Sequence, residues 1–228
     1  MPIGFRVKSD MERVDPSYIE AFRALPVANV SDSMSRLVAG GDRLRPMHGG
    51  GVLSGPALTV KTCPGDNLML HKAIDIASPG DVIVVDAGGD TTNALMGELM
   101  LAHAVKRGVA GFVLNGAIRD AEAIRAQDLP LYAIGVTHRG PYRTGPGEIG
   151  FQISIAGMVI NPGDLILGDF DGVVCIPRAD ADTVLKATRA KHEAEAKQMN
   201  ATVLGEIDRS WVDRELQRLG CSFVGEGA

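Results

Sequence analysis

Two short segments of the sequence contain residue types that could bind and transform an anionic substrate. Gly97-Glu98-Leu99-Met100 stands at a predicted loop-to-helix junction, and Arg119-Asp120 stands in the loop after the next predicted strand. Free backbone N–H groups at a helix start attract a carboxylate, and an arginine can hold the same anion through two hydrogen bonds. An aspartate can bind a hard divalent cation. The two segments therefore predict an anion and metal site, provided that the fold brings them together.

The pair Arg119-Asp120 also fits a purely structural role, as an ion pair within a loop or as a helix cap. The dipeptide alone does not distinguish these roles. Its spacing adds information, because twenty residues separate it from Glu98 and the turn-forming run Asn115-Gly116-Ala117 precedes it.

The elements that must position these segments form a β-α-β pattern. The run 82–85 is short, β-branched and wholly apolar, as expected of a strand buried on both faces. Helical spacing over 95–107 and a second buried strand over 109–114 follow it. The loop 115–120 then carries the Arg-Asp pair. Ligands of open α/β sheets bind beyond the carboxyl ends of the strands, which is where both segments would lie.

The rest of the chain alternates short strands and helices, which favours an α/β fold. Asp15-Pro16 supplies a cap and a first-turn proline for one helix, and Ser31 or Asp32 could cap a second. Helices are predicted over 16–24, 68–77, 121–126, 180–204 and 211–219, and strands over 49–61, interrupted at Gly55-Pro56, and over 131–136.

The composition limits the classes of protein to which the chain can belong. It has 228 residues, of which 45% are hydrophobic and 22% charged, with a formal net charge of −5, as expected of a soluble globular chain. No apolar run approaches the roughly 18 residues that span a bilayer, and the charged N-terminus does not fit a signal peptide. Scattered lysines and arginines argue against a nucleic-acid surface. Three cysteines without a C-x-x-C pair favour the reducing cytoplasm.

With these motifs the sequence resembles the RraA-like family. This family includes regulators of ribonuclease E activity and the metal-dependent 4-hydroxy-4-methyl-2-oxoglutarate and 4-carboxy-4-hydroxy-2-oxoadipate aldolases. Glu98, twenty intervening residues and Arg119-Asp120 match the family signature. Other family-like segments are Pro64-Gly65-Asp66-Asn67 with His71 on the following helix, Asn161-Pro162-Gly163-Asp164, and Asp169-Phe170-Asp171-Gly172-Val173-Val174. The resemblance covers about residues 25–225.

The resemblance implies an α/β fold of the swivelling β/β/α type over 1–178. The composition of the C-terminal segment, rich in Ala, Lys, Glu and Gln with few helix breakers, predicts a helical extension over 179–228 that packs on the same or a neighbouring subunit. The chain would form homotrimers or homohexamers with sites at the subunit boundaries. Its partner would be a small 2-oxo acid rather than a nucleic acid or a membrane.

The resemblance also implies roles for individual residues. Arg119 corresponds to the substrate-binding arginine, and Asp120 to the only direct protein ligand of Mg²⁺ or Mn²⁺. A single carboxylate suits Mg²⁺, which keeps several waters when bound. The substrate-binding loop corresponds to Gly97, Glu98, Leu99 and Met100.

In the aldolases, acidic groups from an adjacent subunit are expected to complete the site. Asp32 and Glu195 are the candidates, with Glu193 as an alternative to Glu195. His71 is expected to be a packed residue rather than a ligand. The residues that could recognise the far end of a substrate are Lys72, His138, Arg139 and Arg143.

The predicted function is that of a metal-dependent lyase that cleaves a 4-hydroxy-2-oxo acid and releases pyruvate, with oxaloacetate decarboxylation as a side activity. A non-catalytic regulator of a ribonuclease or helicase is the main alternative, because it would share the fold and the Arg-Asp pair. The additional segment 180–224 favours the enzyme. A methyltransferase, suggested by 84–89, fits poorly because Asp90 replaces the final glycine of the cofactor loop.

Overall fold

The computed structural model describes residues 3–37, 40–222 and 224. The chain divides into two compact units, Met1–Arg189 and Ala190–Ala228. The helices are α1 (Pro16–Arg23), α2 (Val27–Ser33), α3 (Leu68–Ile76), α4 (Glu98–Arg107), α5 (Ala121–Arg125), α6 (Ala181–Leu204), α7 (Ser210–Arg218) and a 3₁₀ turn at Arg178–Asp180.

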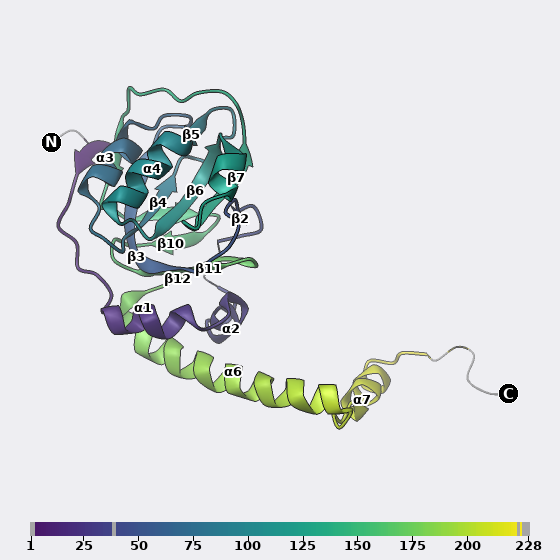
Figure 1. The fold of residues 1–228 in the computed structure, drawn as a ribbon. Coiled ribbons are helices and arrows are strands. Elements are labelled where there is room, and N and C mark those ends of the chain that lie inside the picture. Colours follow the sequence, from purple (N-terminus) through teal and green to yellow (C-terminus); the bar gives the residue numbers. More distant parts are fainter. Residues whose placement is uncertain (1–2, 38–39, 223, 225–228) are drawn as a thin grey trace. The chain divides into compact units, whose positions relative to one another are not determined.

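The first unit is built on a largely parallel sheet (Figure 1). Its strands follow the order β1-β8-β3-β4-β6-β7-β2, and the central neighbours β3, β4, β6 and β7 run parallel. The short strand β5 pairs with the end of β6. These strands are β1 (Phe5–Val7), β2 (Arg45–Pro46), β3 (Leu53–Thr62), β4 (Val82–Asp86), β5 (Ala94–Met96), β6 (Gly111–Ile118), β7 (Leu131–Val136) and β8 (Gly147–Ile149).

Strand β3 belongs to two β layers. Its first half pairs antiparallel with β11 (Leu165–Asp169), which pairs in turn with β12 (Gly172–Ile176). Its second half pairs with β4 and β8. The hairpin of β9 (Ile153–Ile155) and β10 (Met158–Ile160) shares a buried apolar cluster with these strands. Two β layers and flanking helices confirm the predicted α/β fold class.

Helices cover both layers. On one side α3 and α4 lie over β4 and β6 (Figure 1), where Leu70, Ile74 and Leu101 join a buried cluster with Ile83 and Leu114. On the other side α1, α2 and the first turns of α6 pack against β11 and β12. Burying these apolar faces is the main force that fixes the elements against one another.

The helix caps predicted from the sequence are confirmed for α1 but not for α2. The Asp15 carboxylate accepts a backbone N–H at 2.8 Å and caps α1, as predicted, and Gly108, at φ +74°, ends α4. The prediction that Ser31 or Asp32 caps a helix is wrong, because α2 begins at Val27 and both residues lie inside it. The preceding Pro26 cannot donate a backbone hydrogen bond and starts the helix instead.

Three strand predictions also need correction. Leu95 lies in β5 rather than in a helix, because Ala94–Met96 pairs with the end of β6. The predicted loop over 115–118 is the continuation of β6, held by β5 on one side and β7 on the other. Gly55-Pro56 does not interrupt β3; the strand changes partners there.

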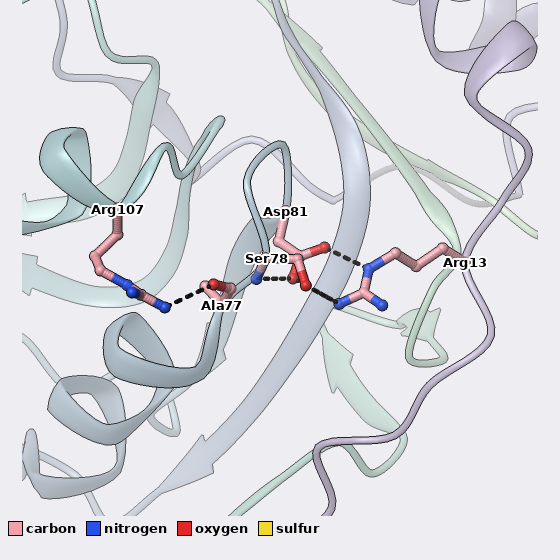
Figure 2. Close-up of polar contacts among 5 residues, drawn as sticks. All are labelled: Arg13, Ala77, Ser78, Asp81 and Arg107. Carbon is pink, nitrogen blue, oxygen red and sulfur yellow. Dashed lines mark hydrogen bonds and ion pairs between the residues drawn. The ribbon is translucent and has the colours of Figure 1, made fainter.

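The turn before β4 is held by the buried carboxylate of Asp81 (Figure 2). Asp81 is fully buried. It accepts the Ser78 N–H at 2.8 Å and pairs with Arg13 through Nε at 2.8 Å and Nη2 at 2.9 Å. Arg107, at the end of α4, donates to the Ala77 carbonyl at 3.3 Å beside this turn. The turn therefore ties the N-terminal segment, α3 and α4 to the sheet.

The second unit consists of the rest of α6 and of α7. The helices confirm the predicted C-terminal helical extension. The side chain of Trp211 is largely exposed, and α7 has no buried residue among those described. The domain boundary after residue 178 stays a prediction. The first turns of α6, which follow it, pack into the core of the first unit through Ala181, Val184 and Leu185.

Candidate functional site

The two segments singled out in the sequence meet at the carboxyl end of β6. Met96, at the end of β5, pairs with Ile118, and its carbonyl accepts the Arg119 N–H at 3.0 Å. Gly97 then forms the N-cap of α4. The loop-to-helix junction and the Arg-Asp pair are therefore neighbours because two short strands end side by side.

Asp120 is held in an unusual backbone conformation. It has φ +55° and ψ +39°, in the left-handed region that most residues with a side chain avoid. Its Oδ2 accepts the Glu98 N–H at 3.0 Å and lies 3.8 Å from Arg119 Nε. A Cβ on Gly97 would collide with this Oδ2 atom. The absence of a side chain at Gly97 is thus what lets the carboxylate approach the start of α4.

The Asp120 carboxylate remains accessible. Its side chain is 42% exposed, and within the described part of the chain Oδ1 accepts no hydrogen bond. Among the described residues no group of three or more His, Cys, Asp and Glu side chains converges on one point. A cation here would have one carboxylate and complete its coordination with water or substrate oxygens, which suits Mg²⁺.

Arg119 lines two cavities. The smaller cavity, of about 110 Å³, is lined by Arg119 together with residues at the starts of α3 and α4 and in the loop after β7. The other, of about 300 Å³, includes Asp120 and His138. The smaller cavity is lined by Asn67, His71, Met96, Gly97, Leu99, Met100, Arg119, Pro141 and Arg143.

Two polar atoms on residues that line the smaller cavity are buried and have no hydrogen-bond partner among the described residues. They are His71 Nε2 and Asn67 Oδ1. The Asn67 amide nitrogen donates to the Leu95 carbonyl at 2.8 Å, which fixes the orientation of the side chain. Buried polar atoms are almost always paired in folded proteins, so this pair indicates a place for a polar ligand.

His71 is kept neutral by its surroundings. Burial lowers the pKa of the imidazole, and the nearby positive charge of Arg143 lowers it further. The carboxylate of Asp75 acts in the opposite direction but does not outweigh them. A neutral imidazole can donate one hydrogen bond and accept another without adding charge to the cavity.

The loop that carries Arg143 is fixed to the start of α3 by a buried carboxylate. Asp66 accepts N–H groups from Leu68 at 2.9 Å, Thr144 at 2.6 Å and Gly145 at 2.9 Å. Burial alone would raise the pKa of Asp66, but these hydrogen bonds outweigh it and lower the pKa. Tyr142 N–H also donates to the Gly65 carbonyl at 2.8 Å.

The predicted substrate loop is divided between several environments. Gly97 and the buried Met100 line the smaller cavity, and Leu99 lines it while 84% exposed. Glu98 contributes its backbone N–H to Asp120, and its side chain is not among those that line either cavity. His71 is partly buried, as predicted, and its unpartnered Nε2 adds a polar function that the sequence did not reveal.

The acidic residues expected from a neighbouring subunit lie elsewhere in the chain. Asp32 is on α2, which packs on β11 and β12, and forms an ion pair with Arg36 at 2.8 Å. Glu195 is on α6 in the second unit and pairs with Lys191 at 2.9 Å. Their roles, and that of Glu193, concern a second copy of the chain and stay predictions.

Comparison with known proteins gives a consistent picture. Residues 27–175 match the RraA-like family model, described as Aldolase/RraA. A protein of Halalkalibacterium halodurans with the provisional name 4-hydroxy-4-methyl-2-oxoglutarate aldolase is 41% identical over 189 residues, which cover 82% of this chain and 90% of that protein.

Two solved structures are similar in fold. An uncharacterised protein of Pseudomonas syringae superposes with a TM-score of 0.76 and 25% identity, covering 86% of this chain and 97% of that one. The RNA-processing inhibitor RraA of Thermus thermophilus gives a TM-score of 0.62 and 28% identity, over 67% of this chain and 92% of that one. None of the described helices is long and apolar enough to cross a membrane.

Proposed function

This chain belongs to the RraA-like family, and from that premise we propose that it is a divalent-metal-dependent aldolase. It cleaves 4-hydroxy-2-oxo acids, such as 4-hydroxy-4-methyl-2-oxoglutarate or 4-carboxy-4-hydroxy-2-oxoadipate, to pyruvate and a second 2-oxo acid. The observation that carries this proposal is the placement of Arg119 in a cavity with unpartnered polar atoms, beside the accessible carboxylate of Asp120.

The reaction requires groups that stabilise the negative charge of an enolate. A base removes the proton of the C4 hydroxyl, the C3–C4 bond breaks, and its electron pair moves to the C2 carbonyl oxygen. C4 becomes the carbonyl carbon of one product, and the pyruvate enolate takes up a proton at C3 to give the other. Fixed positive groups near the C2 oxygen lower the energy of this enolate and so accelerate cleavage.

Several groups of this chain can stabilise that charge. The Arg119 guanidinium donates hydrogen bonds to the C1 carboxylate and the C2 oxygen. The N–H groups of Leu99 and Met100, in the first turn of α4, have no partner within the helix and add positive potential. Asp120 would hold a divalent cation, which would supply further positive charge for stabilising the enolate. Among the residues that the structure describes, no lysine lines either cavity, so none of them offers an amine there for a Schiff base.

The base that accepts the C4 hydroxyl proton is Glu98 or a carboxylate of an adjacent subunit, Asp32 or Glu195. Decarboxylation of oxaloacetate needs no such base, because loss of CO₂ from C4 gives the same pyruvate enolate directly. The proposal therefore includes oxaloacetate decarboxylation as a side activity. It also includes a cytoplasmic homotrimer or homohexamer, since only an oligomer could bring Asp32 or Glu195 of one copy to the site of another.

The test is a pyruvate-release assay on both aldols and on oxaloacetate, with Mg²⁺ or Mn²⁺ added and with a chelator. We expect release from all three, loss of release with the chelator, and loss of both activities in Asp120→Ala. Glu122→Gln, an exposed carboxylate on α5 outside both cavities, is the control and should retain activity. Inactivation by borohydride in the presence of pyruvate, with no effect of the chelator, would contradict the mechanism.

A second candidate function is a regulator of RNA processing, supported by the 28% identity to the Thermus thermophilus RraA protein. The same assay separates the two candidates. If none of the three acids releases pyruvate with either metal, the regulatory function becomes the better hypothesis.

A further inference from the structure

The chain uses one Pro-Gly-Asp turn three times, and the aspartate of each turn is buried. The turns end at Asp66, Asp81 and Asp164, which are 2%, 0% and 3% exposed. In each turn the aspartate N–H donates to the carbonyl three residues earlier, at 3.0 to 3.1 Å, and the glycine has a φ between +70° and +90°. Because the backbones are alike, a difference in role comes from what the carboxylates contact.

Two of the three carboxylates close their own turn. Asp81 Oδ2 accepts the Ser78 N–H at 2.8 Å, and Asp164 Oδ2 accepts the Asn161 N–H at 2.9 Å. In both cases the donor is three residues before the aspartate. Neither aspartate is among the residues that line the two cavities beside Arg119. These two turns therefore serve the fold away from the candidate site.

The carboxylate of Asp66 is directed elsewhere. Its Oδ1 accepts the Leu68 N–H at 2.9 Å, at the start of α3. Its Oδ2 accepts the N–H groups of Thr144 and Gly145 at 2.6 and 2.9 Å, and the Thr144 hydroxyl at 3.3 Å. One oxygen thus holds the start of α3, and the other holds a loop that lies 78 and 79 positions later in the chain.

These two segments are walls of the smaller cavity. Asn67 and His71 line it from α3 and its N-cap, and Pro141 and Arg143 line it from the loop after β7. The Asn67 N–H also donates to the Tyr142 carbonyl at 3.0 Å, beside the buried carboxylate. Because both walls are held by these hydrogen bonds before a ligand binds, little conformational entropy is lost on binding.

We propose that Asp66 is a positioning residue of the site, which holds the two walls of the smaller cavity in register and so sets the affinity for a 2-oxo acid. This inference rests on the proposed function and assigns to it a residue that does not touch the substrate. Arg119 and Asp120 are held by β5 and by the start of α4 instead. Loss of Asp66 should therefore weaken binding and leave the chemical step nearly unchanged.

The test compares Asp66→Asn with Asp81→Asn, the same substitution at an equally buried carboxylate of the same turn. An asparagine has one carbonyl oxygen and can replace only one of the two acceptors, so one wall loses its hydrogen bond. Titration calorimetry of the full chain with pyruvate and Mg²⁺ should give a Kd about tenfold higher for Asp66→Asn. The Kd of Asp81→Asn should stay within about twofold of the native value.

Two further measurements separate positioning from a general loss of stability. In pyruvate-release kinetics, Asp66→Asn should raise KM about tenfold with kcat within about threefold, which is the pattern of lost binding rather than lost catalysis. In native-state hydrogen exchange, the amides of Thr144 and Gly145 should lose protection in Asp66→Asn and keep it in Asp81→Asn.

A milder variant keeps the test informative if Asp66→Asn does not fold. Thr144→Val removes only the hydroxyl that donates to Oδ2 and should raise the pyruvate Kd about twofold. Denaturant unfolding shows which variants are folded. The inference is overturned if a folded Asp66→Asn, or in its absence Thr144→Val, binds pyruvate as the native chain does. Equal weakening in Asp81→Asn, or no binding by the native chain, would also overturn it.

The failure of this inference can be distinguished from the failure of the proposed function. A chain that releases pyruvate and keeps its KM in Asp66→Asn retains the function and lacks this role of Asp66. A chain that binds pyruvate through an arrangement that depends on Asp66, but cleaves none of the three acids, retains the positioning role and lacks the proposed chemistry.

Discussion

Two aspartates at opposite ends of the parallel strands show how one residue type takes two roles. Asp81 precedes β4, is fully buried and accepts three hydrogen bonds, two of them from Arg13 (Figure 2). Asp120 follows β6, is 42% exposed and accepts one backbone hydrogen bond. The two carboxylates differ in the number of hydrogen-bond donors that surround them. A buried carboxylate with both oxygens hydrogen-bonded holds the fold together, and one with an open oxygen can still bind a ligand.

The largest expected effect tests the open carboxylate. Asp120→Asn should lower kcat/KM for pyruvate release on the order of 10³-fold, because an amide does not hold the divalent cation that stabilises the enolate. Asparagine tolerates the left-handed backbone, so the free energy of unfolding should change by less than about 0.5 kcal/mol. Steady-state kinetics and denaturant unfolding measure the two effects. A large loss of stability would remove the contrast with Asp81.

The same substitution at the buried carboxylate of Asp81 should have the opposite result. Asp81→Asn removes the buried negative charge that pairs with the partly exposed Arg13, and should lower the free energy of unfolding by about 2 kcal/mol. The kcat/KM value should stay within about twofold. Asp182→Asn, which removes an exposed helical pair with Lys186, is the control and should cost less than about 1 kcal/mol. A stable Asp81→Asn would show that the buried pair contributes little.

Asp66 is a buried carboxylate near the site, and its effect should depend on pH. Because its pKa in the folded chain lies below the unfolded value of about 3.9, its stabilisation is complete at neutral pH and is lost as pH falls through the folded pKa. Asp66→Asn should cost about 2 kcal/mol at pH 7. Unfolding measured from pH 7 to 2.5 should show the difference from the native chain shrinking below pH 4, and a constant difference would contradict it.

The smallest expected effect concerns Gly97. A methyl group there would displace the Asp120 carboxylate from the start of α4, and we expect Gly97→Ala to lower kcat/KM about tenfold. Gly50→Ala is the control, because a Cβ at Gly50 would contact nothing within 4 Å. Equal kinetics for both alanine variants would show that the close approach of Asp120 has no catalytic value.

The sequence predicts best what depends on neighbouring residues. Strand β7 has its predicted bounds, 131–136, because a continuous apolar run between polar turns specifies a buried strand locally. Strand β5 was missed because only pairing with β6, some twenty residues later, makes 94–96 extended. The intrinsic preference of such a short segment is weak, and tertiary contacts decide it.

The candidate site follows the same rule. The Arg-Asp pair could be found because it is contiguous and its spacing from Glu98 is distinctive. Asn67 and Arg143 could not be assigned to one cavity, because their loops are brought together by hydrogen bonds that Asp66 accepts from residues 78 and 79 positions away. The local sequence around either residue does not specify that the two loops lie side by side.

The change of partners within β3 has a consequence for the order of events during synthesis. Its second half can pair with β4 as soon as residue 86 has left the ribosome. Among the described strands, its first half pairs with β11 alone, which ends at Asp169. The segments of the candidate site, 97–100 and 119–120, are translated between these two points. The site strands can therefore assemble while the first half of β3 still presents an unpaired edge, the kind of surface that a chaperone would protect until the chain is nearly complete.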